Sequence, residues 1–419
     1  MTPRPGTEPS GPLVAVVERA PAIDADAELH WTARDDGAIE AWGAAVTLEG
    51  ADLAALADPA REILHALQVH APADAPLPRL FGGQCFDPSV SGVGGPWAGL
   101  PRARLVLPRW TLFDRGGERW RCWVGAPGEA EGRHRCLPVG RLVSGGGPTR
   151  PVDDPAARAA WDARVRAALI AMARGEAEKL VAARCERWTR PGGWSNAELV
   201  ARMPVEAGAR FVVPLGGDAR LVAATPEVLV ARTGDEVRCD ALAGSIPRRT
   251  GDDDARIAAL RASVKDQREH AVVASFLCDA LRSLGLAVTR PTGPSVRSLA
   301  SVHHLWTPVT GHGDPAPDAL TLAAALHPTP AVAGLPRDVA LRWIAAHEEV
   351  SRGWYAGAVG WCDASGDGRW VVALRSMLVR GDEAWAWAGA GLVPGSEAAA
   401  EWAETEAKLR TARVALGAS

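Results

Sequence analysis

Two glutamates and a lysine near the C-terminal end have the types and spacing for metal or anion chemistry. Glu401, Glu404 and Lys408 occupy positions i, i+3 and i+7 of a predicted helix. At 3.6 residues per turn, this spacing places the three side chains within an arc of roughly 60°. Such charges usually form a solvated, salt-bridged helix face. The alternative is a site wall that holds a divalent cation and an anionic substrate, and the spacing alone does not choose between them.

A second carboxylate lies at the edge of a predicted core-facing helix stripe. The apolar positions of that stripe are Val273, Phe276, Leu277, Ala280, Leu281 and Leu284. Glu269 precedes Val273 by four residues, so it is expected at the inward-facing edge of the stripe. Because an isolated buried carboxylate is costly, it needs a partner. Lys265, four residues earlier, would suffice structurally, whereas Mg²⁺ held by one or two carboxylates and substrate oxygens is the functional alternative.

The third set pairs a lysine with a glutamate. Lys179 continues a helical pattern and is followed by two apolar residues, and Glu227 falls in a predicted strand. Burial lowers the pKa of a lysine and raises that of a glutamate. The two could therefore act as general base and general acid near neutral pH. No sequence pattern shows that they face each other, so the pairing is a hypothesis.

The rarity of lysine adds weight to these sets. Lysine and arginine together number 46, yet Lys179, Lys265 and Lys408 are the only lysines. Arginine remains protonated at physiological pH, whereas a buried or crowded lysine can lose its proton. A position that needs a titrating amine therefore cannot be replaced by arginine. Tyr355 is likewise the only tyrosine, against 17 tryptophans.

Strands and helices alternate along the whole chain, which predicts an α/β or α+β fold. We expect a tail at 1–12, a first part at 13–150 and a second part at 151–419, with a Gly/Pro-rich linker over 142–158. The final helix should begin with Ser396 as its N-cap and end before Gly417. The other predicted helices span 51–70, 156–181 and the segment around 256–285, and the predicted strands include 13–20, 43–50, 103–110, 119–126, 221–232, 369–380 and 384–393.

Composition excludes several classes of protein. The 419 residues carry a net charge of −4, and 47% of them are hydrophobic, which indicates a globular chain and argues against a nucleic-acid binder. Seven scattered cysteines without a C-x-x-C pair argue against a zinc ribbon or disulfide framework. The absence of a signal-peptide pattern or a long apolar run predicts a cytoplasmic protein without membrane contact. The segment 363–368 is expected to be a β-turn and not a calcium loop.

Nine strings in the second part resemble the chorismate-utilising enzymes, and most closely the isochorismate synthases of the menaquinone branch. They occur in the family's order over about 240 residues. The strings are EKLVAAR, ATPEVLV, LAGSIPR, KDQREH, HHLWTPVTG, LHPTPAVAGLP, EEVSRGWYAGAVGW, VALRSML and GAGLVPGSEAAAEWAETEAKL. In the first part, FGGQCFDPSV and RLVLPRW also look like the menaquinone-branch members.

This resemblance implies a single large domain of stacked antiparallel sheets flanked by helices, with a diverged N-terminal half. It also implies a Mg²⁺-dependent conversion of chorismate to isochorismate. Lys179 would deprotonate the water that attacks C2 of the ring, and Glu227 would protonate the departing C4 hydroxyl. Glu269 and Glu404 would hold Mg²⁺, with Glu401 as a direct or water-mediated ligand. The implied substrate-binding residues are Gly244, Ser245, His304, Ala331, Tyr355, Arg375, Gly389, Gly391 and Lys408.

The choice of subfamily depends on fewer residues. Ser245 and the segment 326–334 favour release of isochorismate over the further pyruvate elimination of salicylate synthases. That segment also differs from the anthranilate and aminodeoxychorismate synthases, so no glutaminase subunit is expected, and members of this branch are often monomers. A salicylate synthase and a non-catalytic chorismate-binding paralogue remain as alternatives. The sequence leaves open the role of Lys265 and whether the product feeds menaquinone, siderophore or salicylate synthesis.

Overall fold

The structure is a computed structural model, and it describes residues 12–20, 27–90, 94–129, 147–204, 208–248, 251–299 and 302–418. The expected tail at 1–12, apart from residue 12, and the first five residues of the expected linker (142–146) lie outside these ranges. The described strands are β1 (Val14–Arg19), β2 (Leu29–Ala33), β3 (Gly37–Gly50), β4 (Gln68–His70), β5 (Arg79–Gln84), β6 (Ala103–Arg115), β7 (Glu118–Gly125), β8 (Arg150–Pro151), β9 (Lys179–Thr189), β10 (Ala209–Gly216), β11 (Ala219–Thr225), β12 (Val228–Thr233), β13 (Glu236–Pro247), β14 (Ala287–Thr289), β15 (Ser295–Ser298), β16 (Val302–His312), β17 (Gly334–Leu335), β18 (Ala358–Asp363), β19 (Gly368–Val372), β20 (Ser376–Arg380) and β21 (Glu383–Leu392). The described α-helices are α1 (Leu53–Ala66), α3 (Ala157–Ala173), α4 (Asn196–Arg202), α5 (Asp253–Ala262), α6 (Val264–Ser283), α7 (Ala319–Leu326), α8 (Arg337–His347) and α9 (Ala398–Leu416).

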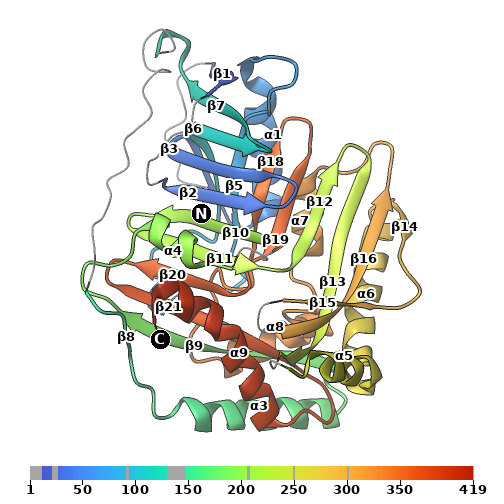
Figure 1. Ribbon diagram of the computed structural model, residues 1–419. Coiled ribbons are helices and arrows are strands. Elements are labelled where there is room, and N and C mark those ends of the chain that lie inside the picture. Colours follow the sequence, from blue (N-terminus) through green and yellow to red (C-terminus); the bar gives the residue numbers. More distant parts are fainter. Residues whose placement is uncertain are drawn as a thin grey trace.

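One large β-structure organises the chain into two arms that share strand β6. Arm A runs from β6 through β5, β18, β19, β12 and β13 to β16. Arm B runs from β6 through β3, β2, β10, β11, β20 and β21 to β9. All of these pairings are antiparallel. Both arms contain strands from each part of the sequence, and Figure 1 shows β12, β13 and β16 of arm A at the right and β20, β21 and β9 of arm B below β2 and β3.

The chain passes between the two arms at two neighbouring crossovers. The first joins β11 of arm B to β12 of arm A, and the second joins β19 of arm A to β20 of arm B. The crossovers are held together where the Thr225 hydroxyl donates to the Val372 carbonyl at 2.6 Å and the Val372 amide donates to the Glu227 carbonyl at 3.1 Å. Residues at these crossovers consequently face both arms at once.

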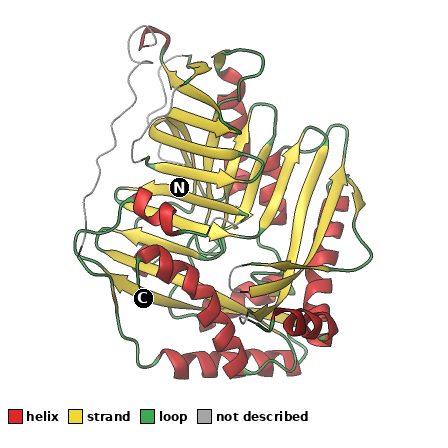
Figure 2. Ribbon diagram, viewed as in Figure 1, coloured by secondary structure: helices red, strands yellow, loops and turns green. Residues whose placement is uncertain are grey.

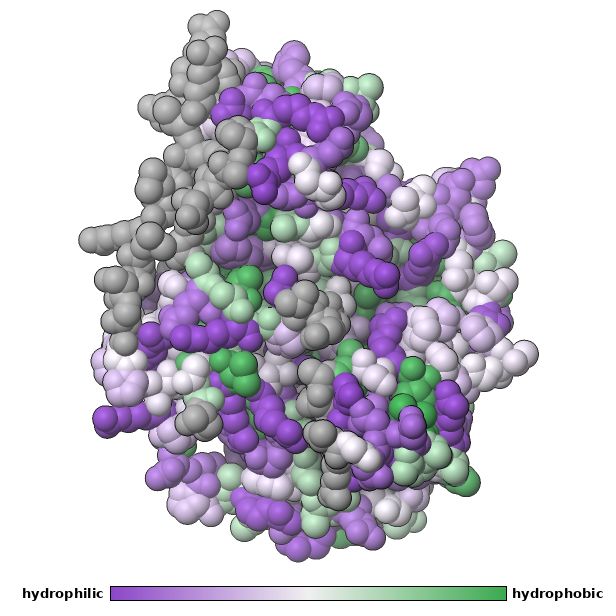
Figure 3. Space-filling model, in the orientation of Figure 1, coloured by the Kyte–Doolittle hydropathy of each residue, from purple (hydrophilic) through white to green (hydrophobic). Residues whose placement is uncertain are grey.

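Helices cover the outer faces of the two arms (Figure 2). Helix α6 packs against β13 and β16 of arm A, whereas α9 packs against β21 of arm B and also contacts β13. Helices α1 and α7, far apart in sequence, pack against each other and against arm A. None of the helices within the described ranges is long and apolar enough to cross a membrane. On the face seen in Figure 3, apolar residues occur in small, separated patches among hydrophilic ones.

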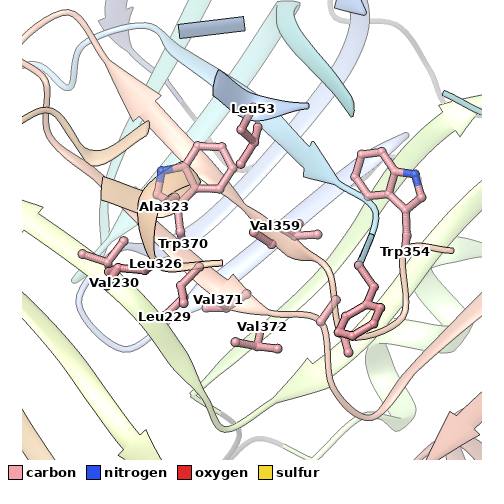
Figure 4. Packing of buried hydrophobic residues seen from close by; sticks show 14 of the residues in the cluster. Leu53, Leu229, Val230, Ala323, Leu326, Trp354, Val359, Trp370, Val371 and Val372 are labelled. Atoms are coloured by element: carbon pink, nitrogen blue, oxygen red, sulfur yellow. The ribbon is translucent and has the colours of Figure 1, made fainter. Parts of the chain in front are cut away.

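The core under α1 and α7 shows how distant segments are joined. Figure 4 shows Leu53 of α1, Leu326 of α7 and Trp370 of β19 gathered in one cluster, and each is at most 2% exposed. Complete burial of such side chains stabilises the fold by roughly 1.5–3 kcal/mol each. This packing fixes β19, and with it the crossover that follows.

Three predicted helix boundaries were wrong. Helix α3 ends at Ala173 because Gly175 adopts a left-handed conformation (φ 73°), so Lys179 begins strand β9 and is not helical. The helix predicted at 51–70 ends at Ala66, and β4 follows it. Helix α9 starts at Ala398 with Glu397 as its N-cap, while the Ser396 hydroxyl accepts a hydrogen bond from the Val393 amide. Gly417 does end this helix in a left-handed conformation.

Candidate active site

A cavity, partly open to solvent, lies where the two crossovers meet the arms. Its walls come from β13, β16, β21, α6 and α9, from both crossovers and from the segments around 331 and 352–356. Twelve of the fourteen residues implied by the family resemblance line it: Glu227, Gly244, Ser245, Glu269, His304, Ala331, Tyr355, Arg375, Gly389, Gly391, Glu404 and Lys408. The other two, Lys179 and Glu401, lie behind this wall in contact with residues that belong to it or flank it.

Backbone strain is concentrated at this cavity. Among the described non-glycine residues, only Ala356 (φ 60°) and Arg375 (φ 48°) have positive φ angles, and both line the cavity. Each such conformation costs on the order of 1–3 kcal/mol and persists only where the surroundings impose it. Arg375 directly follows the turn of the second crossover, so the strain orients this guanidinium toward the space between the arms.

Each of the three lysines forms an ion pair with one of the three carboxylates that the resemblance assigns to metal binding. The Nζ–Oε1 distances are 2.9 Å for Lys179–Glu269, 2.5 Å for Lys265–Glu401 and 2.6 Å for Lys408–Glu404. The pair expected within one helix, Lys265 with Glu269, does not form. Glu269 instead pairs with a lysine from β9, and Lys265 reaches across to α9.

Glu269 and Lys179 meet at a point that only a glycine permits. A Cβ atom on Gly391 would lie 2.2 Å from Glu269 Oε1 and 3.2 Å from Lys179 Cε. The Lys179 side chain is 1% exposed, and its Nζ has no directed hydrogen bond despite the 2.9 Å approach to Glu269. Lys179 therefore has buried N–H groups available to another partner at the cavity.

The charges on α9 do not form a solvated face. Glu401 is 2% exposed, and both Glu404 and Lys408 line the cavity. Burial, together with the nearby Glu404, raises the pKa of Glu401, although Lys265 opposes this. Burial would also raise the pKa of Glu404, but Lys408 and the Ser245 hydroxyl, which donates at 2.8 Å, lower it below its ordinary value. The helical stripe therefore forms a buried wall that carries two carboxylates and one ammonium group.

Glu227 is the carboxyl group whose environment most favours its protonated form. It lies in the first crossover and not on a strand, and it is 3% exposed. Burial raises the pKa of Glu227 to about 8, against the opposing effect of Lys179. A carboxyl group that holds a proton near neutral pH can act as a general acid.

Arg375 and His304 form a cationic corner. Arg375 Nη2 donates to His304 Nε2 at 3.0 Å, and a guanidinium has no acceptor, so the imidazole proton resides on Nδ1. Burial, followed by the charges of Arg375 and Lys408, holds the pKa of His304 well below its usual range, so the ring is neutral. Arg375 has no carboxylate within 4 Å among the described residues. This corner can receive a carboxylate from a ligand.

The wall formed by β21 carries the remaining polar contacts. Lys408 Nζ donates to the Gly389 carbonyl at 2.9 Å, and a Cβ on Gly389 would lie 3.2 Å from the Tyr355 hydroxyl. Burial raises the pKa of Tyr355 to about 12, so it remains a neutral donor. Tyr355 stacks on Trp387, which also lines the cavity. Opposite, Gly244 (φ 75°) makes a bulge in β13 that aligns Ser245 with His304 of β16.

Sequence reasoning did not identify Arg352, which is 3% exposed and supports two walls. Its guanidinium pairs with Glu348 at 2.5 Å and donates to the carbonyls of Val332 and Val181. Glu348 in turn accepts from the Ala183 amide of β9. The i, i+4 spacing of Glu348 and Arg352 was the available signal, but such a pair is usually a surface pair.

The donor chemistry of the site fits a hard cation such as Mg²⁺. Glu269, Glu401 and Glu404 supply carboxylate oxygens, and Mg²⁺ is commonly held by one or two carboxylates together with substrate oxygens. Within the described ranges, no group of three or more His, Cys, Asp or Glu side chains is placed so that it could hold a metal ion by itself. The carboxylates therefore suit a shared site completed by a ligand and not a closed protein cage.

Comparison with known proteins gives a consistent family. Residues 149–417 match the family described as chorismate binding enzyme. The chain is 36% identical over 414 residues to the salicylate biosynthesis isochorismate synthase of Pseudomonas aeruginosa, covering 93% of this chain and 85% of that protein. It is 40% identical over 262 residues to the putative isochorismate synthase MenF of Mycobacterium tuberculosis, covering 59% and 70% of the two chains.

Solved structures share the fold over nearly the whole chain. The menaquinone-specific isochorismate synthase MenF of Escherichia coli superposes with a TM-score of 0.79 at 25% identity, covering 96% of this chain and 94% of that one. The putative 2,3-dihydroxybenzoate-specific isochorismate synthase DhbC of Bacillus anthracis gives 0.76 at 28% identity, covering 95% and 98%. The predicted mixed α/β fold with a large antiparallel sheet and flanking helices is thus confirmed.

Proposed function

The chain belongs to the chorismate-binding enzyme family, and from that premise we propose that it is a Mg²⁺-dependent isochorismate synthase. Water adds at C2 of chorismate, and the C4 hydroxyl leaves as water, so the reaction is an isomerisation. One observation carries the proposal: a single site combines Glu227, whose pKa burial raises to about 8, with the buried Lys179. These are the acid and the base that such an exchange of hydroxyl groups requires.

Proton transfer would use these two residues in turn. Lys179 must first lose the proton that it holds in its ion pair with Glu269. As a neutral amine it then takes a proton from the attacking water, and Glu227 gives its proton to the departing C4 hydroxyl. Because one water enters and one leaves, the atoms balance, and passing a proton from Lys179 back to Glu227 resets the site. Because Lys179 Nζ makes no directed hydrogen bond, its amine is free to bind the water.

The cationic corner would anchor the enolpyruvyl carboxylate. Arg375 offers a guanidinium that forms no ion pair with a described carboxylate, Tyr355 offers a neutral hydroxyl, and Lys408 offers an ammonium. The neutral His304 ring accepts a hydrogen bond from Arg375 and holds its guanidinium in place. The glycines at 244, 389 and 391 and the small residues Ser245 and Ala331 let the ring approach the backbone. A dianionic substrate thus accounts for the convergence of basic groups in a chain of net charge −4.

Glu269 and Glu404 would hold Mg²⁺, with Glu401 as a direct or water-mediated ligand. The cation would neutralise the ring carboxylate of the substrate and help to orient the ring. Since each of these carboxylates pairs with a lysine, cation binding competes with those ammonium groups. We therefore expect Mg²⁺ and substrate to bind cooperatively, because each supplies charge that the other needs.

Product analysis tests the proposal. Purified protein with chorismate and Mg²⁺ should yield isochorismate on chromatography against authentic standards, and chelation should stop the reaction. Salicylate with an equimolar amount of pyruvate would reassign the chain to the salicylate synthases, and anthranilate in the presence of ammonia to the aminating branch. No turnover, together with a chorismate-induced rise in melting temperature, would indicate the non-catalytic paralogue.

The downstream use of isochorismate is a finer proposal. The Pseudomonas relative is named for salicylate biosynthesis. The Escherichia coli MenF is named as menaquinone-specific, and the Vibrio cholerae relative is named as vibriobactin-specific. The names of the relatives thus cover several routes, and we propose a menaquinone or siderophore route, with salicylate as the alternative. Deleting the gene and supplying menaquinone or salicylate separately would distinguish these routes. The supplement that restores growth identifies the pathway.

A further inference from the structure

The general acid lies between the catalytic cavity and a second, solvent-open groove. Glu227 lines the catalytic cavity, whereas the preceding Pro226 lines a solvent-open groove between the arms. Asp240, Arg297 and Trp306 line the groove and not the catalytic cavity. The proposed function assigns them no role.

These three residues form a closed polar cluster on arm A. Asp240 Oδ1 accepts from Trp306 Nε1 at 2.7 Å, and Asp240 Oδ2 accepts from Arg297 Nη1 at 2.9 Å. The Arg297 guanidinium stacks over the Trp306 ring at 4.2 Å. The Asp240 side chain is 14% exposed and that of Arg297 is 30% exposed. Each member is fixed by the other two.

The cluster reaches the backbone of the general acid. Arg297 Nη1 also donates to the Pro226 carbonyl at 3.4 Å, the carbonyl of the peptide that joins Pro226 to Glu227. The Glu227 amide donates to the Thr225 hydroxyl at 3.3 Å, and its carbonyl accepts from the Val372 amide. The backbone of Glu227 is thus held from arm A, from arm B and from the second crossover.

We propose that Asp240, Arg297 and Trp306 form a positioning network for Glu227, in which Asp240 and Trp306 hold Arg297 and Arg297 fixes the Pro226–Glu227 peptide. None of the three contacts the substrate cavity, so each acts through Glu227. The inference rests on the proposed function only in naming Glu227 as the general acid.

Electrostatics around Glu227 support this role. Three cations face the carboxyl group, Lys179 from β9, Arg375 from the second crossover and Lys408 from α9, and each lowers its pKa. Burial, the largest effect, and the Asp240 charge raise it. Asp240 is the anion that counteracts the cations needed for substrate binding, and Arg297 partly neutralises Asp240.

Two substitutions should change the pKa of Glu227 in opposite directions. Asp240→Asn removes the anion, so the pKa of Glu227 should fall. Arg297→Met leaves Asp240 uncompensated, so the pKa should rise. Asp367→Asn is the matched control, because Asp367 pairs with Arg232 at 3.0 Å on arm A but does not line the catalytic cavity.

The full chain is used for two measurements. The carbonyl stretch of protonated Glu227, identified by its loss in Glu227→Gln, gives a titration midpoint by infrared difference spectroscopy without need of turnover. The pH profile of kcat reports the pKa of the same group in the enzyme–substrate complex. We expect the midpoint and the alkaline limb to move down in Asp240→Asn and up in Arg297→Met, with kcat reduced more than KM changes and the control unchanged.

The outcomes separate the network from the function. An unchanged midpoint in Asp240→Asn, or shifts of the same sign in both variants, would overturn the network, because general destabilisation has no reason to produce opposite signs. If the wild-type protein makes no isochorismate while the Asp240→Asn and Arg297→Met variants still shift the midpoint in opposite directions, the proposed function is rejected. The electrostatic role of Asp240 and Arg297 is then retained.

Discussion

Replacing Gly391 by alanine tests how closely the position of Glu269 must be controlled. The added Cβ would lie 2.2 Å from Glu269 Oε1 and 3.0 Å from its Cδ. Because Cβ atoms essentially never approach a neighbour within 3.0 Å, the carboxylate must retreat by about 0.8 Å. The backbone at Gly391 is not left-handed, so an alanine strains no dihedral angle there. The perturbation therefore displaces mainly the Glu269 carboxylate, with a smaller push on Lys179, whose Cε would lie 3.2 Å from the added Cβ.

The expected loss follows from that displacement. A misplacement of about 1 Å in a catalytic group can lower the rate on the order of 10²-fold, which corresponds to about 2.7 kcal/mol of transition-state stabilisation. Overpacking should lower the free energy of unfolding by no more than about 1–3 kcal/mol. We therefore expect Gly391→Ala to be a folded protein with kcat reduced on the order of 10²-fold and with weakened apparent Mg²⁺ affinity.

Isochorismate formation would be followed over a Mg²⁺ titration, with urea denaturation as the measure of folding. Gly293→Ala is the matched control, since Gly293 is exposed, has no positive φ and has no atom within 4 Å of the added Cβ. A folded Gly391→Ala protein with wild-type kcat and Mg²⁺ dependence would refute the reasoning, because Glu269 could then move without consequence.

Three further predictions concern the lysines and the acid. Because Glu227 must donate a proton and burial raises its pKa to about 8, kcat should fall as the pH rises above that value, and Glu227→Gln should abolish turnover; a flat alkaline profile would contradict this. Lys179→Ala should lower kcat by about 10²–10⁴-fold with an unchanged circular dichroism spectrum, and retained turnover would remove Lys179 from the role of base. Lys265→Met leaves Glu401 buried without its cation and should lower the free energy of unfolding by about 1–2 kcal/mol in urea, since solvent partly screens Lys265. The double variant with Glu401→Gln should recover most of that loss.

Local patterns identified four of the residues that line the cavity, Glu227, Glu269, Glu404 and Lys408, and the family resemblance supplied the other eight that were predicted. The stripe on α9 follows from helical periodicity, which fixes the relative directions of Glu401, Glu404 and Lys408 wherever the helix packs. The apolar stripe on α6 likewise placed Glu269 at the cavity. The alternating pattern at 384–393 predicted strand β21 and its glycines. The motif order supplied residues that no periodicity identifies, such as Arg375 and His304.

Pairing between distant segments was not predictable in the same way. The i, i+4 spacing favoured Lys265 with Glu269, but such a pair contributes only about 0.3–0.5 kcal/mol. Packing of β9 beside β21 brings Lys179 to Glu269, and Lys265 pairs instead with Glu401, 136 residues away. The prediction that Lys179 is helical failed for a local reason, because the left-handed Gly175 ends α3.

The sequence by itself determined which residues could do chemistry, because a titrating amine and a carboxylate stripe are properties of residue type and short-range spacing. Only the tertiary structure decided which charges meet. The two crossovers between the arms place Glu227 and Arg375 at one cavity, and the packing of α6, α9 and β9 assigns each lysine its carboxylate. Ion pairs and pKa values depend on distance and burial in three dimensions, and local sequence patterns fix neither across distant segments.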